Sequence, residues 1–559
     1  MSYPIWDVPA PGLLIAGIAI LHVYISHFAV GGGLFLVLAE RRARRTADAG
    51  MLAFVESLSR FFILLTLVLG AVTGVGIWFT IGLVSPMGTS ALINAFVWGW
   101  AIEWTFFVIE IAAAIVYYYG WRRLDAKTHE AVGWIYFVAA WMSLVIINGI
   151  LSFMATPGRW LETRSFWDGF FNPTYVSSLV LRTLVAVGIA GLFALFAAAR
   201  LGDGELKQRI ARWTATRWIL PAAIGVPLCL LWYLGAAAGA GIPVAEIFGA
   251  TSSGPGALVA SVFASDHASG YPPAQRAALV AAIAYPAIVV LTLALLWLRP
   301  RNYGRPVTAL MLLFGIAGMG AGEWAREDLR KPWIIGGYMY VNGVRVPPPA
   351  GAAGPAAEAA RRAPDPFRID VLNERGLLES SVWLAVPAGA EPEDPADRLA
   401  LTGRQVFRGL CSTCHTVDGY LAIRPLVRGQ KVAALERLLE RLDAHRQRRM
   451  PPFAGTDEER HALAVWLARL GGDETAGREV APAATTGHPG AALFEDQCSL
   501  CHAADADFPM AELVAGRGAD ELYDIIGRLP EINDMMPAFE GTDEERRALA
   551  EYLASLEAE

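Results

Sequence analysis

Long apolar stretches alternate with short polar turns over the first 335 residues of the chain. Eight stretches are long enough to cross the hydrocarbon layer of a membrane, which is about 30 Å thick and needs about 20 residues per helix. Lipid offers the backbone no hydrogen bonds, so each stretch is expected to be helical. The predicted spans lie near residues 11–39, 59–84, 91–120, 129–154, 176–199, 217–240, 276–298 and 306–326.

The pattern changes after the last apolar stretch. Residues 346–366 are rich in Pro, Ala and Gly, which is typical of a linker. From residue 395 onward the chain is charge-rich and has amphipathic helical periodicity. The whole pattern predicts an all-α protein, in which an eight-helix transmembrane bundle is followed by two small helical domains. The predicted boundaries are 1–335 for the bundle, 336–394 for a linker, 395–473 for the first helical domain and 474–559 for the second.

Short basic loops set the expected orientation in the membrane. Clusters of Lys and Arg follow the first, third, fifth and seventh spans, at residues 40–45, 121–127, 207–213 and 299–305. Because loops rich in Lys and Arg stay in the cytoplasm, the N-terminus and everything after the eighth span are expected outside. We therefore expect a multi-pass protein of the bacterial inner membrane, with the linker and both helical domains in the periplasm.

Composition narrows the class of protein further. Hydrophobic residues make up 55% of the 559 residues and charged residues 18%, and the mean hydropathy is +0.40. These values exclude a purely soluble chain and a disordered one. The net charge of −7 and the lack of a long basic run predict no nucleic-acid partner.

Two cysteine motifs carry the clearest chemistry. The strings CSTCH (411–415) and CSLCH (498–502) both fit the C-x-x-C-H pattern of heme c attachment. In this pattern two thiols form thioethers to one heme, and the adjacent His becomes an axial ligand of its iron. The residues expected to form the thioethers are Cys411, Cys414, Cys498 and Cys501.

The axial ligands of these two hemes follow from the motifs and from a repeat. His415 and His502 are the expected ligands on one side, and Met commonly takes the other side. Met450 in MPPFAGTDEER and Met536 in MPAFEGTDEER stand at nearly the same distance from their motifs, so the two strings form an internal repeat. In the second domain, Met535 and Met510 are alternatives to Met536.

A zinc site and a redox-active dithiol are the competing interpretations. Zinc requires four ligands, and neither pair of cysteines has two further Cys or His residues at finger spacing. A redox dithiol needs neither the following His nor the Met-Pro element. The sequence therefore predicts two heme c groups, each in a small domain that resembles a class I cytochrome c.

Polar residues inside the predicted spans are the second group of candidates. A charge at the centre of a membrane helix costs roughly 2.5–3.5 kcal/mol, so such residues tend to be functional. On the topology above, most of them lie in the outer half of the bundle, where a cofactor could gather them. They are His22 and His27 in the first span, Glu103 and Glu110 on one face of the third, Arg182 in the fifth, and Glu323 and Glu327 near the outer end of the eighth.

Other candidates receive a structural interpretation. Cys229 in the sixth span is expected to be an inert packing residue. The remaining histidines are expected to be solvated surface residues, namely His129, His267, His445, His461 and His488.

The apolar half of the chain resembles subunit I of the cytochrome bd oxidases. AILHVYISHFAVGGGLFLVLAE (19–40) and AIEWTFFVIEIAAAIVYYYGWRRL (101–124) are similar to that family's first and third helices. EDLRKPW (327–333) is similar to its Glu-x-x-Arg-Gln-Pro-Trp motif. The resemblance covers residues 1–335 at low overall identity, with the motifs in the family's order.

This resemblance implies a set of iron ligands. His22 stands at the position of a high-spin heme ligand, and Glu327 at the position of the ligand of a second high-spin heme. Glu323 is the rival of Glu327 for that role. For His27 a hydrogen-bonding role is expected rather than iron binding.

Supporting roles follow in the same way. By the match, Arg330 supports heme propionates, and we expect Arg182 to form a salt bridge with a propionate as well. Asn148 in NGI resembles the family's Asn-Gly in the fourth helix and is assigned to the cofactor site. Glu103 and Glu110 match two glutamates that line a route to the heme pair, so proton transfer is expected of them.

The chain also departs from the family. Arg182 stands where the family has a His ligand of its low-spin heme b, and the seventh span has neither Met nor His. Only residues 241–275 join the sixth and seventh spans, so the long quinol-binding loop is missing, as is the ninth helix. We therefore expect no low-spin heme b and no quinol site, and two c hemes as the substitute source of electrons.

The main functional hypothesis is a membrane-bound terminal reductase. Electrons from a periplasmic donor, such as a soluble cytochrome c, would pass through two c hemes to one or two high-spin hemes in the bundle, of type b or d. A high-spin heme has an open coordination position, where O2 would be reduced to water. Glu103 and Glu110 would supply the protons that this reaction consumes.

Other functions stay open at this point. The chain could be an electron-transfer relay or an accessory subunit of a larger respiratory complex, or it could reduce nitric oxide or another small gas. A relay across the membrane normally has paired His ligands on facing helices, and the few histidines of the bundle favour open hemes instead. The resemblance also implies a second membrane subunit, and the bundle is expected to contact lipid.

Overall fold

The structure is a computed structural model of the chain. It describes residues 5–242, 244, 273–298, 301, 303–348, 354–362, 365–386, 389, 391–444, 450–478, 488–498, 502, 510–532, 536, 538–539 and 541–556. Four residues considered above lie outside this part, namely His267, His445, Cys501 and Met535.

Eight helices of the described part are long and apolar enough to cross a membrane, which confirms the predicted number. Two of them contain a short π-helical stretch, labelled η, between α-helical halves. The eight are α1 (Pro11–Arg45), α2 (Ala49–Ile63) with η1 (Leu64–Gly70) and α3 (Ala71–Val84), α5 (Val97–Gly120), α6 (Ala126–Ala155), α9 (Tyr175–Ala198), α10 (Gly204–Thr214) with η2 (Ala215–Ile219) and α11 (Leu220–Gly239), α14 (Pro273–Trp297), and α15 (Arg305–Arg330).

The second and sixth of these helices begin earlier than the hydrophobic pattern predicts. They start at Ala49 and Gly204, whereas apolar character alone begins near residues 59 and 217. In both helices an Asp side chain caps the first turn. Asp48 accepts a hydrogen bond from the Met51 backbone N–H at the start of α2, and Asp203 accepts from backbone N–H groups in the first turn of α10. The caps extend the helices through polar turns that hydropathy leaves out.

Helix α1 lies at the centre of the bundle. It packs against α2, α3, α6, α9 and α15. Two glycines bring its neighbours close: a Cβ at Gly31 would lie 2.0 Å from the Ala186 carbonyl oxygen of α9, and a Cβ at Gly33 would lie 2.3 Å from the Tyr136 ring of α6. The helix that carries His22 and His27 is therefore in contact with the helices that carry Arg182, Glu323 and Glu327.

Short elements cover the end of the bundle at which α1 begins and α15 ends, which we call the domain end; the opposite end is the far end. An aromatic cluster that includes Phe96, Phe153 and Trp160 holds these elements on the long helices. They are α4 (Pro86–Ala95), α7 (Trp160–Thr163), α8 (Phe166–Phe170) and the antiparallel strands β1 (Trp333–Ile335) and β2 (Met339–Tyr340).

The first soluble domain, domain 1, is larger than predicted. Its α-helices are α19 (Pro395–Leu410), α20 (Val432–Glu440) and α21 (Asp457–Leu470), preceded by α16 (Pro355–Arg362), α17 (Ile369–Arg375) and α18 (Leu377–Ser380). It also contains two short 3-10 helices, η3 (Arg424–Val427) and η4 (Leu442–Ala444). Leu372 and Leu377 are fully buried in the same cluster as Val406 and Leu463. The expectation of a plain linker over residues 336–394 therefore does not hold for α17 and α18, which belong to the core of domain 1.

The second soluble domain, domain 2, repeats the plan of the first. Its helices are α22 (Pro489–Gln497), α24 (Met510–Val514), α25 (Ala519–Ile526), α26 (Leu529–Ile532) and α27 (Asp543–Ala554). In domain 1 a Cβ at Gly403 would lie 2.0 Å from the Ala462 carbonyl oxygen, and in domain 2 a Cβ at Gly490 would lie 2.1 Å from that of Ala548. Both α21 and α27 begin with a Thr–Glu capping box. The sequence repeat is thus also a repeat of helix crossings.

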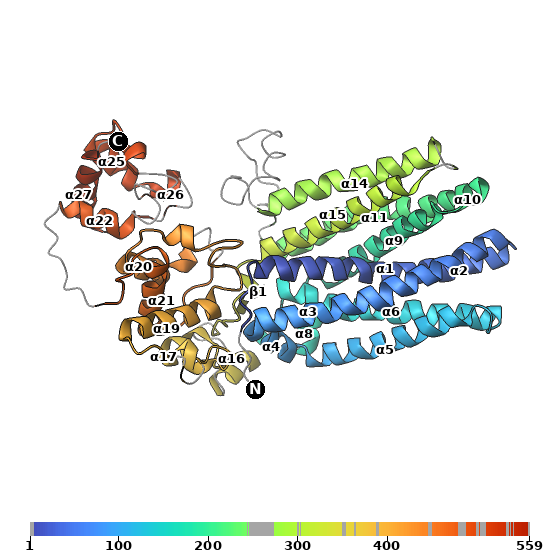
Figure 1. Cartoon of the computed structure of the whole chain (residues 1–559), viewed down its shortest axis with the longest axis horizontal. Helices are drawn as coiled ribbons and strands as arrows, with labels where there is room; N and C mark the ends of the chain where they lie inside the picture. The colour runs from blue at the N-terminus through green and yellow to red at the C-terminus, as the bar shows by residue number, and fades with distance from the viewer. Residues whose placement is uncertain are drawn as a thin grey trace.

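The parts are arranged in a line. Figure 1 shows the bundle helices running side by side, domain 1 against their domain end, and domain 2 beyond domain 1. The first described residue, Ile5, contacts Arg408 of domain 1.

Candidate functional site

The first heme-attachment motif forms a tight turn at the end of α19. The backbone N–H groups of Cys414 and His415 both donate to the Cys411 carbonyl, over 3.1 and 2.9 Å. His415 Nδ1 lies 3.2 Å from the Leu421 carbonyl oxygen, so Nδ1 donates and the ring is oriented for coordination through Nε2. These residues fit a covalently held heme c.

The two thiols of this motif have the chemistry of attachment sites. Burial raises the pKa of the Cys411 thiol to about 12 and raises the pKa of the Cys414 thiol as well. Redox-active dithiols have thiol pKa values at or below the usual 8.5 or so, because the thiolate is the reactive form. The raised pKa values favour thioether attachment over the dithiol alternative.

The second motif follows the same geometry as far as the structure describes it. Cys498 ends α22, and the His502 backbone N–H donates to its carbonyl over 3.1 Å. Phe453 and Phe539 pack against the buried clusters of domains 1 and 2, and each follows its proposed Met ligand, at 450 or 536, by three residues. The segment that follows each proposed Met ligand is therefore attached to the core of its own domain.

In the bundle, His22 lies on α1 against α3. Its Nδ1 atom is 3.1 Å from the Thr73 hydroxyl oxygen. A Cβ at Gly74 would lie 3.0 Å from the His22 ring. Thr73 therefore orients the ring and Gly74 gives it room, which is the support that an axial ligand requires.

His27 lies one and a half turns further along α1 and is almost fully buried. Its Nδ1 atom donates to the Val23 carbonyl oxygen over 2.8 Å, in agreement with the expected hydrogen-bonding role. Its Nε2 atom is buried without a hydrogen-bond partner among the described residues. The sequence did not predict that this nitrogen is buried and unpaired.

Charged residues of α9 and α15 form one cluster at the domain end. Arg182 pairs with Glu323 over 2.9 Å. Arg326 pairs with both Glu323 and Glu327, over 3.0 and 2.8 Å, and Glu327 also pairs with Arg330. We call these five residues the domain-end cluster. It brings together Arg182, Glu323, Glu327 and Arg330, which the sequence singled out, and adds Arg326.

The domain-end cluster fits a group that carries carboxylates. Its three guanidinium groups outnumber its two carboxylates, which leaves a formal excess of one positive charge. Arg326 Nη1 and Arg330 Nε are buried without hydrogen-bond partners in the described part of the chain. Buried polar groups are nearly always satisfied, so these atoms suit heme propionates, and Glu327 is held where Arg326 and Arg330 would share it with an iron.

Two further glutamates face α6 from α5. The Ser143 hydroxyl donates to Glu103 over 2.8 Å, and the Tyr136 hydroxyl donates to Glu110 over 3.0 Å. The Tyr136 hydroxyl also lies 3.2 Å from the Ala29 carbonyl oxygen of α1. Both carboxyls are thus hydrogen-bonded inside the bundle.

This pattern continues to the far end. Glu103, Glu110 and Tyr117 are spaced by seven residues on α5, and so are their α6 counterparts. Residues seven apart lie on one face of a helix, so the pairs stack along the α5–α6 interface. We call this row the polar ladder; its α6 members are Ser143, Tyr136 and His129.

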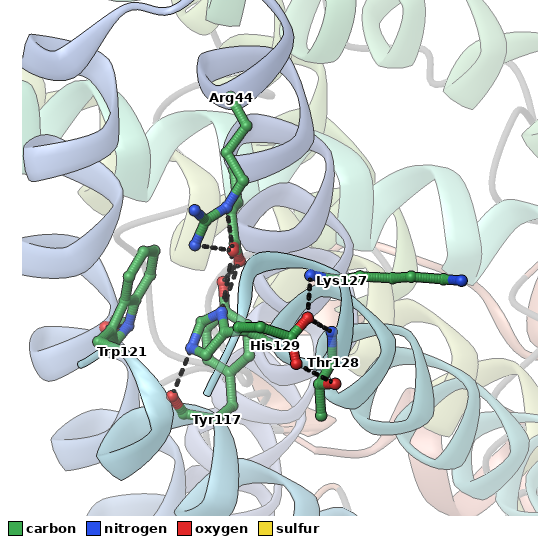
Figure 2. Close-up of polar contacts among 9 residues, drawn as sticks. Arg44, Tyr117, Trp121, Lys127, Thr128 and His129 are labelled. Carbon is green, nitrogen blue, oxygen red and sulfur yellow. Dashed lines mark hydrogen bonds and ion pairs between the residues drawn. The ribbon is translucent and has the colours of Figure 1, made fainter. Parts of the chain in front are cut away.

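At the far end, the last pair of the polar ladder is hydrogen-bonded to a buried carboxylate. Figure 2 shows the His129 ring between Tyr117 and Trp121, with ring centroids 4.3 and 4.4 Å away. His129 Nδ1 lies 2.9 Å from Glu40, whose carboxylate also accepts from the Tyr117 hydroxyl over 2.8 Å. The expectation that His129 is solvated is wrong: it is fully buried, because Glu40 of α1 stands opposite it.

Glu40 and His129 are joined by a hydrogen bond. His129 Nε2 lies 2.9 Å from the Tyr117 carbonyl oxygen, which only accepts, so Nε2 carries a hydrogen. The contact between Nδ1 and the Glu40 carboxylate needs one further hydrogen, carried by either partner. Arg44 pairs with Glu40 over 2.8 Å and is partly exposed, so the pair is close to the surface at the far end.

Asn148, which is expected at the cofactor site, links two helices of the bundle. Its amide nitrogen donates to the Tyr175 carbonyl over 3.0 Å, and its oxygen accepts from the Ser178 hydroxyl over 2.7 Å. Both ends of the buried amide therefore hold α6 against α9. Among the other histidines, His461 is exposed and bonded to Glu436, as expected for a surface residue.

Comparison with known proteins assigns both halves of the chain. Residues 13–240 match the family model of cytochrome bd terminal oxidase subunit I. Residues 398–467 and 485–553 each match the model of cbb3-type cytochrome c oxidase subunit III. The chain is a cytochrome bd oxidase-like membrane domain fused to two cytochrome c domains.

One solved structure that resembles this bd-like protein is the bd oxidase from Geobacillus thermodenitrificans. The two share 15% identity, and the match covers 64% of this chain and 94% of that chain, with a TM-score of 0.43. No curated protein matches the chain. The bd family match includes His22, Glu103, Glu110 and Arg182 and ends before α15, so the α15 residues of the domain-end cluster are supported by their geometry alone.

The assignment fixes the general class. The bd-like protein is a multi-pass membrane oxidoreductase of the respiratory type. Its cytochrome c domains imply covalently bound heme c and electron exchange with other redox proteins, and the bd family implies hemes in the bundle.

Proposed function

We propose that the protein is a terminal reductase that takes electrons from a soluble periplasmic donor through two c hemes and reduces O2 to water at a high-spin heme in the bundle. The observation that carries the proposal is the domain-end cluster, with Glu327 between Arg326 and Arg330, on a helix packed against the one that bears His22. When bound, a high-spin heme supplies an open coordination position for a small gas. The balanced reaction takes one O2, four electrons and four protons to two waters.

The chain's own residues have distinct parts in this proposal. His22, oriented by Thr73, would hold an iron from α1. Glu327 would hold a second iron from α15, and its ion pair with Arg330 fixes the position of the carboxylate. Arg182 and Arg326 would balance the charge of propionates at the same end.

The polar ladder supports proton delivery from the far end. Glu110 and Glu103 are the two carboxyls along it, and each is bonded to a hydroxyl group that can pass a proton on. The hydrogen-bonded Glu40–His129 pair near the far end is the proposed site of proton uptake. Successive rungs lie about 10 Å apart at 1.5 Å per helical residue, so water must bridge them.

Orientation in the membrane is part of the proposal. With the basic loops in the cytoplasm, the far end faces the cytoplasm and supplies protons, while domains 1 and 2 lie in the periplasm of the bacterial inner membrane. A second membrane subunit is proposed by analogy with the bd family.

Oxygen uptake by the purified protein with reduced soluble cytochrome c tests the proposal. The proposal predicts cyanide- or CO-sensitive uptake with four donor molecules oxidised per O2. Donor oxidation that needs a second protein and consumes no O2 would refute it and favour a relay, for which the unpaired Nε2 of His27 offers an additional ligand. Turnover with nitric oxide but not with O2 would identify nitric oxide as the substrate.

A further inference from the structure

Domain 1 is anchored to the bundle by the segment that precedes α1. The Arg408 guanidinium of α19 donates to the Ile5 carbonyl oxygen. The Tyr420 backbone N–H, just after the first heme motif, donates to the Pro9 carbonyl oxygen over 3.0 Å. These bonds hold domain 1 to residues that lead directly into the helix of His22.

A common apolar core crosses the same boundary. Ile5 and Met87 come from the membrane half and Val344 from the segment that follows β2, and they are 4%, 3% and 1% exposed. They belong to one buried cluster with Leu410 of domain 1, and Asn342 donates to the Leu410 carbonyl over 3.3 Å. A buried core with hydrogen bonds indicates a fixed contact, because apolar burial contributes about 25 cal/mol per Å².

The heme-attachment loop of domain 1 faces the ends of both ligand-bearing helices. A Cβ at Gly12, in the first turn of α1, would lie 3.9 Å from the carbonyl oxygen of Thr413, which stands between the two cysteines. Lys331 directly follows Arg330 at the end of α15 and lies close enough to the Cys414 thiol for its charge to act on it. His22 follows Gly12 by about 15 Å along α1, at 1.5 Å per residue.

Domain 2 has a different position. Its helix α22 packs against α20 of domain 1. In Figure 1 domain 2 lies beyond domain 1, away from the bundle. The described contacts therefore connect the three parts in series.

We infer that domain 1 is the immediate electron donor to the bundle and that domain 2 accepts electrons from the soluble donor. This order rests on the proposed function. Each step moves one electron: the soluble one-electron carrier is oxidised as domain 2 is reduced, domain 2 is oxidised as domain 1 is reduced, and domain 1 is oxidised as the bundle is reduced. No bond forms or breaks in these steps, and no proton moves with the electron between the domains.

Loss of one sixth ligand at a time tests the order. The fully reduced, CO-bound full-length protein is mixed with O2, and oxidation of the c hemes is followed after a light flash removes CO. Met450→Ala in domain 1 is expected to slow oxidation of both c hemes by about tenfold or more. Met536→Ala in domain 2 is expected to slow only its own heme. The reverse asymmetry, or equal effects, would overturn the order.

A matched pair of variants tests the contact itself. Val344→Asp places a charge in the shared core, whereas Val382→Asp makes the same change at a residue that is 63% exposed. We expect Val344→Asp to remove hydrogen-exchange protection at Tyr420 and to slow electron transfer from domain 1 to the bundle by about tenfold, and Val382→Asp to change neither. Unchanged protection and an unchanged rate in Val344→Asp would refute the contact. If that variant does not accumulate, Asn342→Ala replaces it, and we expect a smaller loss of protection and a smaller decrease in rate.

Failure of the inference is distinguishable from failure of the proposed function. If O2 oxidises neither c heme in the unaltered protein, the proposed reductase is wrong, while hydrogen exchange at Tyr420 still reports on docking. If O2 oxidises both c hemes but the ligand variants act in the reverse order, the reductase stands and the order falls.

Discussion

Neighbouring residues on α3 orient the His22 ring and leave room for it. Its Nδ1 atom is held by Thr73, and Gly74 leaves space for its ring. A membrane His with only a structural role would usually have both ring nitrogens in hydrogen bonds within the helix layer. His27 fits this description for one of its two ring nitrogens, because its Nδ1 atom bonds to the preceding turn of its own helix.

Replacing His22 separates the bundle site from the c hemes. His22→Ala should abolish a high-spin heme signal and leave both c hemes, because only the bundle site loses a ligand. The measurement is the reduced spectrum of the purified variant. His461→Ala, at an exposed His of domain 1, is the control. Identical spectra for His22→Ala and the unaltered protein would refute the assigned ligand.

Glu110 can be tested with a neutral isostere. Glu110→Gln keeps an oxygen that accepts from Tyr136 but cannot carry a proton, so turnover should fall by about tenfold or more with heme content unchanged. Oxygen uptake and hemochrome quantitation measure the two quantities. Glu130→Gln, on the surface of α6 beside Arg41, should leave turnover unchanged. Full activity of Glu110→Gln would end the proposed proton route.

The Glu40–His129 pair makes a separate prediction. Glu40→Gln preserves the size of the side chain but removes the carboxylate that is hydrogen-bonded to His129, so turnover should fall by about tenfold. The matched control is Glu56→Gln, since Glu56 pairs with Arg60 near the same end but lies outside the polar ladder. Equal activity of the two variants would place proton uptake elsewhere.

The sequence anticipates residues that carry a motif and misses those that depend on a partner from another helix. The CSTCH motif, the repeat of Met450 and Met536, and the glutamates of α5 were all visible as patterns. His129 was misjudged, because nothing near it in sequence shows that Glu40 lies opposite. The seven-residue spacing from His129 through Tyr136 to Ser143 was the available signal.

At the scale of elements, the helices follow hydropathy except where local capping or tertiary contacts extend them. Asp48 and Asp203 start α2 and α10 well before the apolar stretches. Residues 369–384 read as linker because their composition is mixed, yet Leu372 and Leu377 are fully buried in domain 1. Short amphipathic helices of this kind give too weak a periodic signal to be identified from sequence.

The helix crossings of the cytochrome c domains depend on small residues. Gly490→Ala would place a Cβ 2.1 Å from the Ala548 carbonyl oxygen, so α22 and α27 must separate. We expect a loss of about 1–3 kcal/mol in the unfolding free energy of domain 2, measured by denaturant titration at its heme absorption band. Gly518→Ala meets no atom within 4 Å and is the control in the same domain. An unchanged midpoint for Gly490→Ala would contradict the crossing.

At the scale of the whole molecule, the three parts are arranged in series: domain 2 contacts domain 1, and domain 1 contacts the bundle. The α15 residues of the domain-end cluster lie at the domain end, where α15 ends. The Glu40–His129 pair lies at the far end, where α1 ends and α6 begins. Electrons and protons would therefore approach the site from opposite faces of the membrane. The sequence predicted the three parts and their number of spans, but not that residues 5–12 tie domain 1 to the bundle, because contacts between distant segments leave no local pattern.

The proposed reductase requires an open, gas-binding heme in the bundle in addition to the two c hemes. A reduced-plus-CO minus reduced difference spectrum of the purified protein, with pyridine hemochrome quantitation of b and c hemes, is the measurement to make. CO should bind to a bundle heme alongside about two c hemes per chain, one for each C-x-x-C-H motif. Absence of CO binding, with only low-spin hemes present, would refute an open bundle heme and assign any catalysis to a partner.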